Sequence, residues 1–185
     1  MSARRGVLYV VVCGTLAAGD VGTLICLAQA KGWEVCVVAT PQALSFIDRA
    51  ALEAQTGYPV RYEYKQPETE DVLPPPDAII VGGASFNTIN KWAGGISDTL
   101  ALGILNQAIG LKLPVVVMPF LDSALAAHPA FENSVAVLRR AGVRVLLGPE
   151  VYEPQAPGTG PQVLVSYPWS AGVKAVEELV REGGE

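Results

Sequence analysis

Histidine and clusters of basic residues are scarce in this chain. Its 185 residues include one histidine, and the formal net charge is −5 at pH 7. Arg4-Arg5 and Arg139-Arg140 are isolated pairs, so the sequence disfavours general binding to nucleic acid or to a membrane surface. Only 17% of the residues are charged and 50% are apolar, which indicates an extensive core or some surface buried against partner chains.

Cysteine is also limited, with Cys13, Cys26 and Cys36 all in the first 40 residues. An odd number without paired spacing fits a reducing cytoplasm better than a disulfide scaffold. No spacing of histidine, cysteine and carboxylates indicates a metal site. The apolar run at residues 7–12 is too short for a bilayer and has no cleavage site after it, so we expect a strand there.

Two common nucleotide motifs are absent from the first turn. Gly14, Gly19 and Gly22 do not form G-x-G-x-x-G, and no lysine follows as a P-loop would require. Nicotinamide dinucleotides and nucleoside triphosphates are therefore disfavoured. The remaining Gly14-Thr15 turn offers backbone N–H groups and one hydroxyl, which suits a monophosphate.

Thr40 ends the next expected strand, so its hydroxyl can join the same phosphate site. It also precedes Pro41, which can begin a helix, so Thr40 fits equally well as a helix cap. The residues alone leave both interpretations open.

Strand-like and helix-like segments alternate along the chain, which predicts right-handed βαβ units and a doubly wound parallel sheet. Residues 60–64 alternate like a shorter edge strand. We expect a single α/β domain over residues 1–185, with a mobile Gly- and Pro-rich flap at residues 148–165. The expected strands cover residues 7–13, 34–40, 60–64, 77–81, 113–118 and 143–147. The expected helices cover residues 21–31, 41–47 (continued or restarted at 50–55), 95–109, 129–141 and 170–181.

The stretch at residues 82–100 is the most informative. It follows the apolar run 78–81 and opens an apolar helix, a place where backbone N–H groups and the helix dipole attract anions. A helix cap needs one polar residue, whereas Ser85, Asn87, Thr88 and Asn90 fall within six positions. We therefore expect a ligand site here.

Residues 84–100 resemble the Pro-Ala-Ser-Ala-Asn-Thr signature of the homo-oligomeric flavin-containing cysteine decarboxylases. That family includes phosphopantothenoylcysteine decarboxylase and the lantibiotic peptidyl-cysteine decarboxylases. Gly83 replaces the proline of the signature and Phe86 its second alanine. The Gly14-Thr15 turn, residues 40–47 and the clamp-like residues 119–133 are similar to other parts of the family, and the resemblance covers roughly residues 7–147.

The resemblance implies a flavodoxin-like, Rossmann-like three-layer sandwich that binds FMN between subunits of a homo-oligomer, a trimer or a multiple of trimers. It implies a small-molecule or peptide substrate. The residues that it assigns to FMN are Gly14, Thr15, Leu16, Thr40, Gln42, Ser85, Phe86, Asn87, Thr88 and Phe120.

The chain departs from the family where the chemistry is expected. Family decarboxylases use a histidine upstream of the signature strand, but residues 63–77 contain none, and Thr69 falls near its place. Asp122 replaces the clamp asparagine and, when ionised, cannot donate to a substrate carboxylate. In phosphopantothenoylcysteine decarboxylase, a late cysteine in the flap completes the reaction. No cysteine follows Cys36 in this chain, which disfavours that step of coenzyme A synthesis.

The single histidine, His128, lies in the clamp loop and is either structural or a replacement acid/base. We expect an FMN-dependent oxidoreductase or decarboxylase-like enzyme, with Asn87, Asp122 and His128 as candidate catalytic residues. The alternative is a non-catalytic flavin-binding or regulatory protein. A third interpretation is a domain that binds another phosphorylated ligand.

Overall fold

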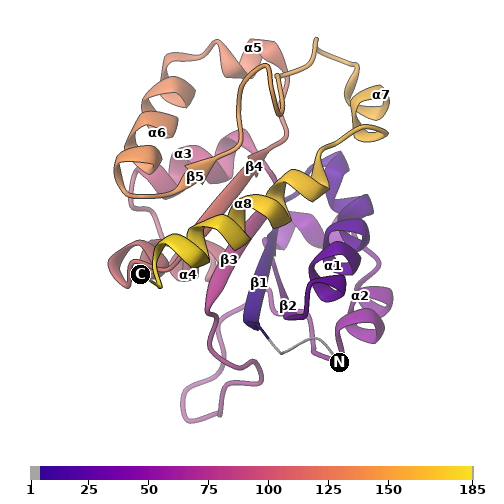
Figure 1. Ribbon diagram of the computed structural model, residues 1–185, viewed down its shortest axis with the longest axis vertical. Helices are drawn as coiled ribbons and strands as arrows, with labels where there is room; N and C mark the ends of the chain where they lie inside the picture. The colour runs from indigo at the N-terminus through magenta and orange to yellow at the C-terminus, as the bar shows by residue number, and fades with distance from the viewer. Residues whose placement is uncertain (1–4, 185) are drawn as a thin grey trace.

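The computed structural model describes residues 5–184 and is built around a parallel sheet with strand order β2-β1-β3-β4-β5 (Figure 1). The order reverses between β1 and β3, which pair directly from Leu8↔Ala78 to Val12↔Gly82. Parallel strands deliver their carboxyl ends to one edge, and ligands of such sheets bind where the strand order reverses. The doubly wound, flavodoxin-like fold expected from the sequence is confirmed.

The strands are buried on both faces because each is an apolar run without polar alternation. In β1, for example, Leu8 and Val10 contact one core while Tyr9 and Val11 contact the other. The strands are β1 (Gly6–Val12), β2 (Trp33–Ala39), β3 (Ala78–Ala84), β4 (Val115–Pro119) and β5 (Arg144–Val145).

Helices cover both faces and complete a three-layer sandwich, with α1 and α8 on one face and α3, α4 and α6 on the other (Figure 1). Within residues 5–184, no helix is both long and apolar enough to cross a membrane. The helices are α1 (Val21–Ala30), α2 (Arg49–Thr56), α3 (Phe86–Ala93), α4 (Leu100–Gly110), α5 (Ser123–Ala126), α6 (Pro129–Arg140), α7 (Gly160–Leu164) and α8 (Trp169–Glu182), with the short 3₁₀ helices η1 (Leu16–Asp20) and η2 (Pro41–Ser45).

The helix expected at residues 95–109 begins only at Leu100, as α4, and a separate helix, α3, precedes it. Ser85 caps α3 at the very start of the polar stretch, so this stretch is itself helical. Gly95 then takes a φ of 72°, which interrupts the helix, and Thr99 caps α4 by accepting a hydrogen bond from the N–H of Leu102.

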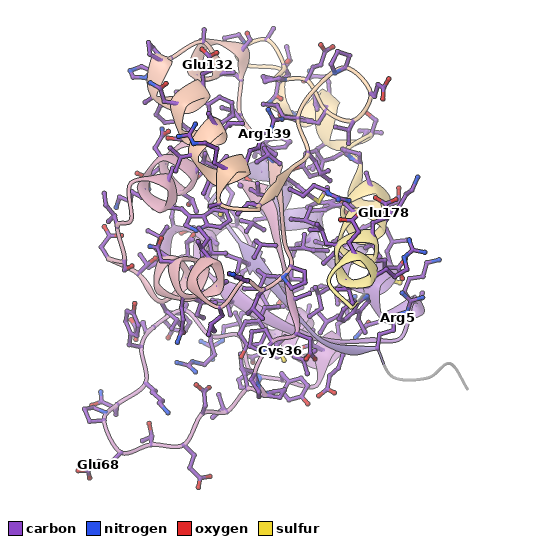
Figure 2. All side chains as sticks on the ribbon, turned by 60° about the vertical axis from the view of Figure 1, so that its left-hand side comes forward. Arg5, Cys36, Glu68, Glu132, Arg139 and Glu178 are labelled. Atoms are coloured by element: carbon purple, nitrogen blue, oxygen red, sulfur yellow. The ribbon has the colours of Figure 1, made fainter. Side chains whose placement is uncertain are left out.

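The edge strand expected at residues 60–64 does not form. Only Arg61 pairs with the sheet, as an isolated bridge to Val38 on β2. The chain then leaves the sheet, and residues 61–76, here called the strap, run without a helix to the start of β3. Figure 2 shows the strap as a loop that projects from the body of the molecule, with Glu68 at its tip.

Candidate functional site

A cavity of about 360 Å³ lies at the carboxyl edge of the sheet. Its walls come from the ends of β1 and β2 and from α3 and α4, so distant parts of the sequence meet there. Six of the ten residues that the resemblance assigned to a cofactor are among its lining residues. These lining residues are Gly14, Thr40, Pro41, Gln42, Ser85, Asn87, Thr88, Lys91, Thr99 and Leu102.

Gly14 and Gln42 are in close contact in this cavity. A Cβ atom on Gly14 would lie 2.5 Å from Cγ and 2.8 Å from Cβ of Gln42. A side chain at position 14 would therefore displace Gln42, so the packing at this position requires glycine.

Ser85 and Thr88 organise the start of α3. The Ser85 Oγ accepts a hydrogen bond from the Thr88 N–H at 3.1 Å and lies 3.0 Å from the Thr88 Oγ1. Ser85 is thus a helix cap as well as a cavity residue. Asn87, by contrast, is exposed in the first turn of α3, where the first N–H groups of a helix have no partner within it.

Thr40 does not act as a cap. It precedes η2, yet its side chain makes no capping hydrogen bond, and the residue is buried. Its backbone N–H donates to the Val12 carbonyl oxygen at 2.8 Å, which fixes the end of β2 beside the end of β1. The cap interpretation of the Thr40 side chain is therefore wrong, and the role of its hydroxyl in binding a ligand stays a prediction.

Lys91 is a cavity residue that the sequence interpretation missed. It lies one helical turn after Asn87, so both face the cavity, and this i, i+4 spacing was the available signal. Its Nζ forms an ion pair with Asp98 at 2.5 Å, and 33% of its side chain is exposed. Among the described residues that line the cavity, Lys91 alone carries a formal charge, and its partner Asp98 does not line the cavity.

Thr15 and Leu16 lie outside the lining of this cavity. The Thr15 Oγ1 donates to the Gly83 carbonyl oxygen at 2.9 Å, which ties the first turn to the end of β3. Gly83 has a φ of 64°, a value that proline cannot adopt, so the backbone here differs from any that the proline of the signature allows. Leu16 is exposed, and a Cβ on Gly160 would lie 3.1 Å from its Cδ1.

Phe120 is buried beneath the segment that the sequence predicts as a flap. Its ring packs edge-on against Tyr167, with 5.3 Å between centroids. The Tyr167 hydroxyl in turn shares its proton between the carbonyl oxygens of Met118 and Pro119, at 2.8 and 2.9 Å. Burial raises the pKa of Tyr167 well above its usual value, so this hydroxyl remains a donor.

Asp122 caps α5, since its Oδ1 accepts a hydrogen bond from the Leu125 N–H at 2.9 Å. It also forms an isolated bridge with Gln155, and the N–H of Ser123 donates to the Gln155 carbonyl oxygen at 2.7 Å. Residues 148–165 therefore contact the clamp-like loop directly. The mobility of this segment stays a prediction.

His128 is an exposed residue that caps α6. Its Nδ1 accepts a hydrogen bond from the Ala130 N–H at 3.1 Å, so the neutral ring carries its proton on Nε2. The ring packs edge-on against Phe86 with 5.6 Å between centroids, and Phe86 also stacks with Phe131. Phe86 thereby links the start of α3 to the clamp-like loop.

Cys13 lies at the end of β1 and is buried. Burial raises the pKa of its thiol, which keeps it protonated at neutral pH. Thr69, which the sequence places near the position of the missing histidine, lies in the exposed strap and donates to the Gln66 carbonyl oxygen at 2.7 Å. Neither residue offers a base to the cavity.

Comparison with known proteins places this geometry in a family. Residues 2–180 match the Flavoprotein family. The coenzyme A biosynthesis bifunctional protein CoaBC of Mycolicibacterium smegmatis is 30% identical over 150 residues, which is 79% of this chain and 35% of that protein. The chain thus spans about a third of the length of the curated relatives that it matches.

Two solved structures share the fold over most of the chain. The FMN-dependent cysteine decarboxylase SpaF has a TM-score of 0.71 at 20% identity, covering 95% of this chain and 98% of its own. The epidermin biosynthesis protein EpiD from Staphylococcus aureus has a TM-score of 0.63 at 26% identity, covering 75% of this chain and 81% of its own. The resemblance noted in the signature stretch is confirmed, and the chain belongs to the Flavoprotein family.

Proposed function

We propose that the cavity at the carboxyl edge holds FMN and that the chain is an FMN-dependent, decarboxylase-like enzyme. The proposal rests on three features that meet at one cavity. They are the close Gly14–Gln42 contact, the Thr40 hydroxyl, which makes no capping hydrogen bond, and the start of α3. Glycine backbone, hydroxyls and a helix N-terminus are the groups that bind a phosphate monoester. The donor set therefore fits this cofactor.

The residues of the cavity have separate roles in this proposal. Gly14, Thr40 and Gln42 hold the phosphate and ribityl end. Asn87, with both donor and acceptor groups on an exposed amide, orients the polar edge of the flavin and the substrate. Lys91 contributes a positive charge that Asp98 keeps in position.

Phe86 and the clamp-like loop form the side from which substrate approaches. His128 contacts Phe86, and its Nε2–H can donate a hydrogen bond to a substrate held at the clamp-like loop. Asp122 is committed to capping α5, and its carboxylate repels a substrate carboxylate placed next to it. We therefore assign substrate orientation to His128 and loop positioning to Asp122.

FMN, when bound, supplies an acceptor for the hydride that a substrate loses on oxidation before its carboxylate leaves as CO2. Relatives named as decarboxylases or as coenzyme A biosynthesis proteins favour this function over a non-catalytic flavin-binding protein. Substrates ending in a cysteine with a free carboxylate are the first class to examine. We further propose a cytoplasmic homo-oligomer, a trimer or a multiple of trimers.

The test incubates FMN-loaded protein without oxygen with peptides that end in cysteine. The matched controls are the same peptides as C-terminal amides, which have no carboxylate to lose. We expect CO2 release and flavin bleaching with the free acids alone. Asn87→Ala should keep FMN and lose turnover.

If FMN binds but neither CO2 nor bleaching appears with any cysteine-ending peptide or small thiol acid, the decarboxylase-like function is wrong and the non-catalytic alternative holds. Turnover that is equal for acids and amides would also contradict it.

A further inference from the structure

A second cavity is larger than the one at the carboxyl edge. It has a volume of about 620 Å³ and lies between α4 and the strap, on the face of the sheet covered by α3, α4 and α6. None of its lining residues is shared with the carboxyl-edge cavity, although α4 forms a wall of both. Its size is typical of sites for small molecules.

The cavity exists because the connection from β2 to β3 has no helix over this face. A connection between parallel strands usually carries one, and it crosses on the side opposite α1 to keep the right-handed sense. Here α2 packs with the core on the α1 side through Leu52, and only the strap crosses the other face. The strap leaves a space that a helix would have filled.

The strap is held at several points along its length. At its start, the Arg61 N–H donates to the Val37 carbonyl oxygen at 3.1 Å, and its guanidinium forms an ion pair with Asp71 at 2.6 Å. At its end, the Tyr9 hydroxyl donates to the Pro74 carbonyl oxygen at 2.8 Å. The cavity beneath it is therefore a defined part of the fold.

Gly103 shows that α4 is shaped to receive the strap. A glycine inside a helix costs about 1 kcal/mol relative to alanine. Here a Cβ at position 103 would lie within clashing distance of the Tyr64 hydroxyl, which donates to the Thr99 carbonyl oxygen at 3.2 Å. The glycine thus admits Tyr64 against the helix, at the wall of the cavity.

The lining combines an apolar floor with a basic rim. Lys65 lies at the rim and, among residues 5–184, makes no ion pair. Arg61 lies beside it with 14% of its side chain exposed and keeps N–H groups beyond those used by Asp71 and Glu63. The floor is formed by Val38, Ile79, Leu100, Ile104, Ala108 and Leu113.

The acidic residues of the strap do not cancel this basic rim. Asp71 also lines the cavity, but it is paired with Arg61, so Lys65 supplies the uncompensated charge of the rim. Glu68 lies at the tip of the projecting loop, away from the body (Figure 2), and neither it nor Glu70 lines the cavity. A ligand head group at the rim therefore meets an excess of positive charge.

We propose that the cavity beneath the strap is a second binding site, for a small molecule with an aromatic or branched apolar body and one anionic head group. The body lies on the floor around Ile104, and the head group lies at Lys65. This site is independent of the proposed FMN site and does not rest on it.

The test titrates two probes by calorimetry into the full chain, with and without saturating FMN. Anilinonaphthalene sulfonate has an aromatic body and one negative charge, whereas phenylnaphthylamine has the same body without the charge. We expect the sulfonate to bind at a single site whether or not FMN is present. Titration with FMN present separates this site from the carboxyl-edge cavity.

Three variants locate the site. Ile104→Trp fills the cavity from the half-buried face of α4 and should abolish binding of both probes. Lys65→Gln should weaken the sulfonate about tenfold and change phenylnaphthylamine less than twofold. Lys174→Gln, on α8 outside this cavity, is the control and should change neither.

The proposal is wrong if the wild-type chain binds neither probe, or if Ile104→Trp folds, as judged by circular dichroism, and binds the probes as the wild type does. If Ile104→Trp does not fold, the affinities of Lys65→Gln for the two probes test the proposal instead. If Lys65→Gln weakens the binding of both probes equally, or weakens the binding of neither, the assignment of the head group to Lys65 is wrong.

Discussion

Gln42 packs so closely against Gly14 that a Cβ on Gly14 would lie 2.5 Å from the Cγ of Gln42. The two residues come from the ends of adjacent strands, and both line the carboxyl-edge cavity. Gly14→Ala should therefore push Gln42 into the cavity and weaken FMN binding at least tenfold, about 1.4 kcal/mol. Titration of the apoprotein with FMN, followed by flavin fluorescence, measures this loss.

Gly110→Ala is the matched control for that substitution. Nothing lies within 4 Å of a Cβ at position 110, at the end of α4. It should leave the FMN affinity unchanged and raise the free energy of unfolding by up to about 1 kcal/mol, because alanine favours the helix. Equal FMN affinity for Gly14→Ala and Gly110→Ala would contradict the role of the Gly14–Gln42 contact.

Ser85 has two roles that substitutions can separate. Ser85→Ala removes the cap of α3 and should lower the free energy of unfolding by about 1 kcal/mol in urea titrations. Ser85→Asp keeps a good cap, so its stability should stay within about 0.5 kcal/mol of the wild type. Its added carboxylate in the cavity should nevertheless weaken FMN binding more than tenfold. Tight FMN binding by Ser85→Asp would show that no anion is bound near this residue.

Lys91 should determine how FMN affinity depends on salt. Lys91→Gln removes the charge of the cavity lining and should weaken FMN binding about tenfold at low ionic strength, with a smaller difference at high salt. Lys91→Arg keeps the charge and should retain most of the affinity. Lys174→Gln removes a lysine from α8 and serves as the control. An affinity of Lys91→Gln that matches the wild type at every salt concentration would rule out this contact.

Tyr9 should make the free energy of unfolding depend on pH in the alkaline range. Burial raises its pKa to about 12, with Cys36 and Asp71 adding to the effect. Its ordinary pKa is near 10, so at higher pH the unfolded chain loses this proton first and binds fewer protons than the folded chain. The free energy of unfolding should therefore fall as pH rises from about 10 to about 12.

Tyr9→Phe should remove that part of the pH dependence. It also loses the hydrogen bond to Pro74, so its stability at neutral pH should be lower by about 1 kcal/mol. Urea unfolding of both proteins at neutral pH and at about pH 11 measures the two slopes. If the free energy of unfolding falls equally with pH in Tyr9→Phe and in the wild type, the pKa of Tyr9 is not raised in the folded chain.

The sheet was predictable from the sequence because its strands are buried on both faces. Residues 7–13 and 34–40 are almost continuous apolar runs, and the structure places β1 and β2 there with shifts of one residue at the ends. The connection from β2 to β3 was less predictable. The alternation at residues 60–64 favours a strand, but only Arg61 reaches the sheet, because the strap turns away to contact α4 through Tyr64.

The polar stretch shows what local patterns leave open. Four polar residues between Ser85 and Asn90 favour a loop, yet Ile89 and Trp92 are buried at helical spacing and make this stretch amphipathic. The positive φ of Gly83 could not be predicted from the replacement of proline by glycine. It occurs where the pairing of β3 with β4 is irregular, between Val81 and Ala84. Lys91 was missed because its direction follows from the helix that was not expected.

The most direct test of the FMN site is retention of the cofactor. Purified protein is mixed with excess FMN and desalted, and the flavin absorbance is compared with the protein concentration, with Gly14→Ala treated in parallel. We expect a flavin-to-chain ratio near unity for the wild type and a much lower ratio for Gly14→Ala. A wild-type chain that leaves the column without flavin absorbance would contradict it.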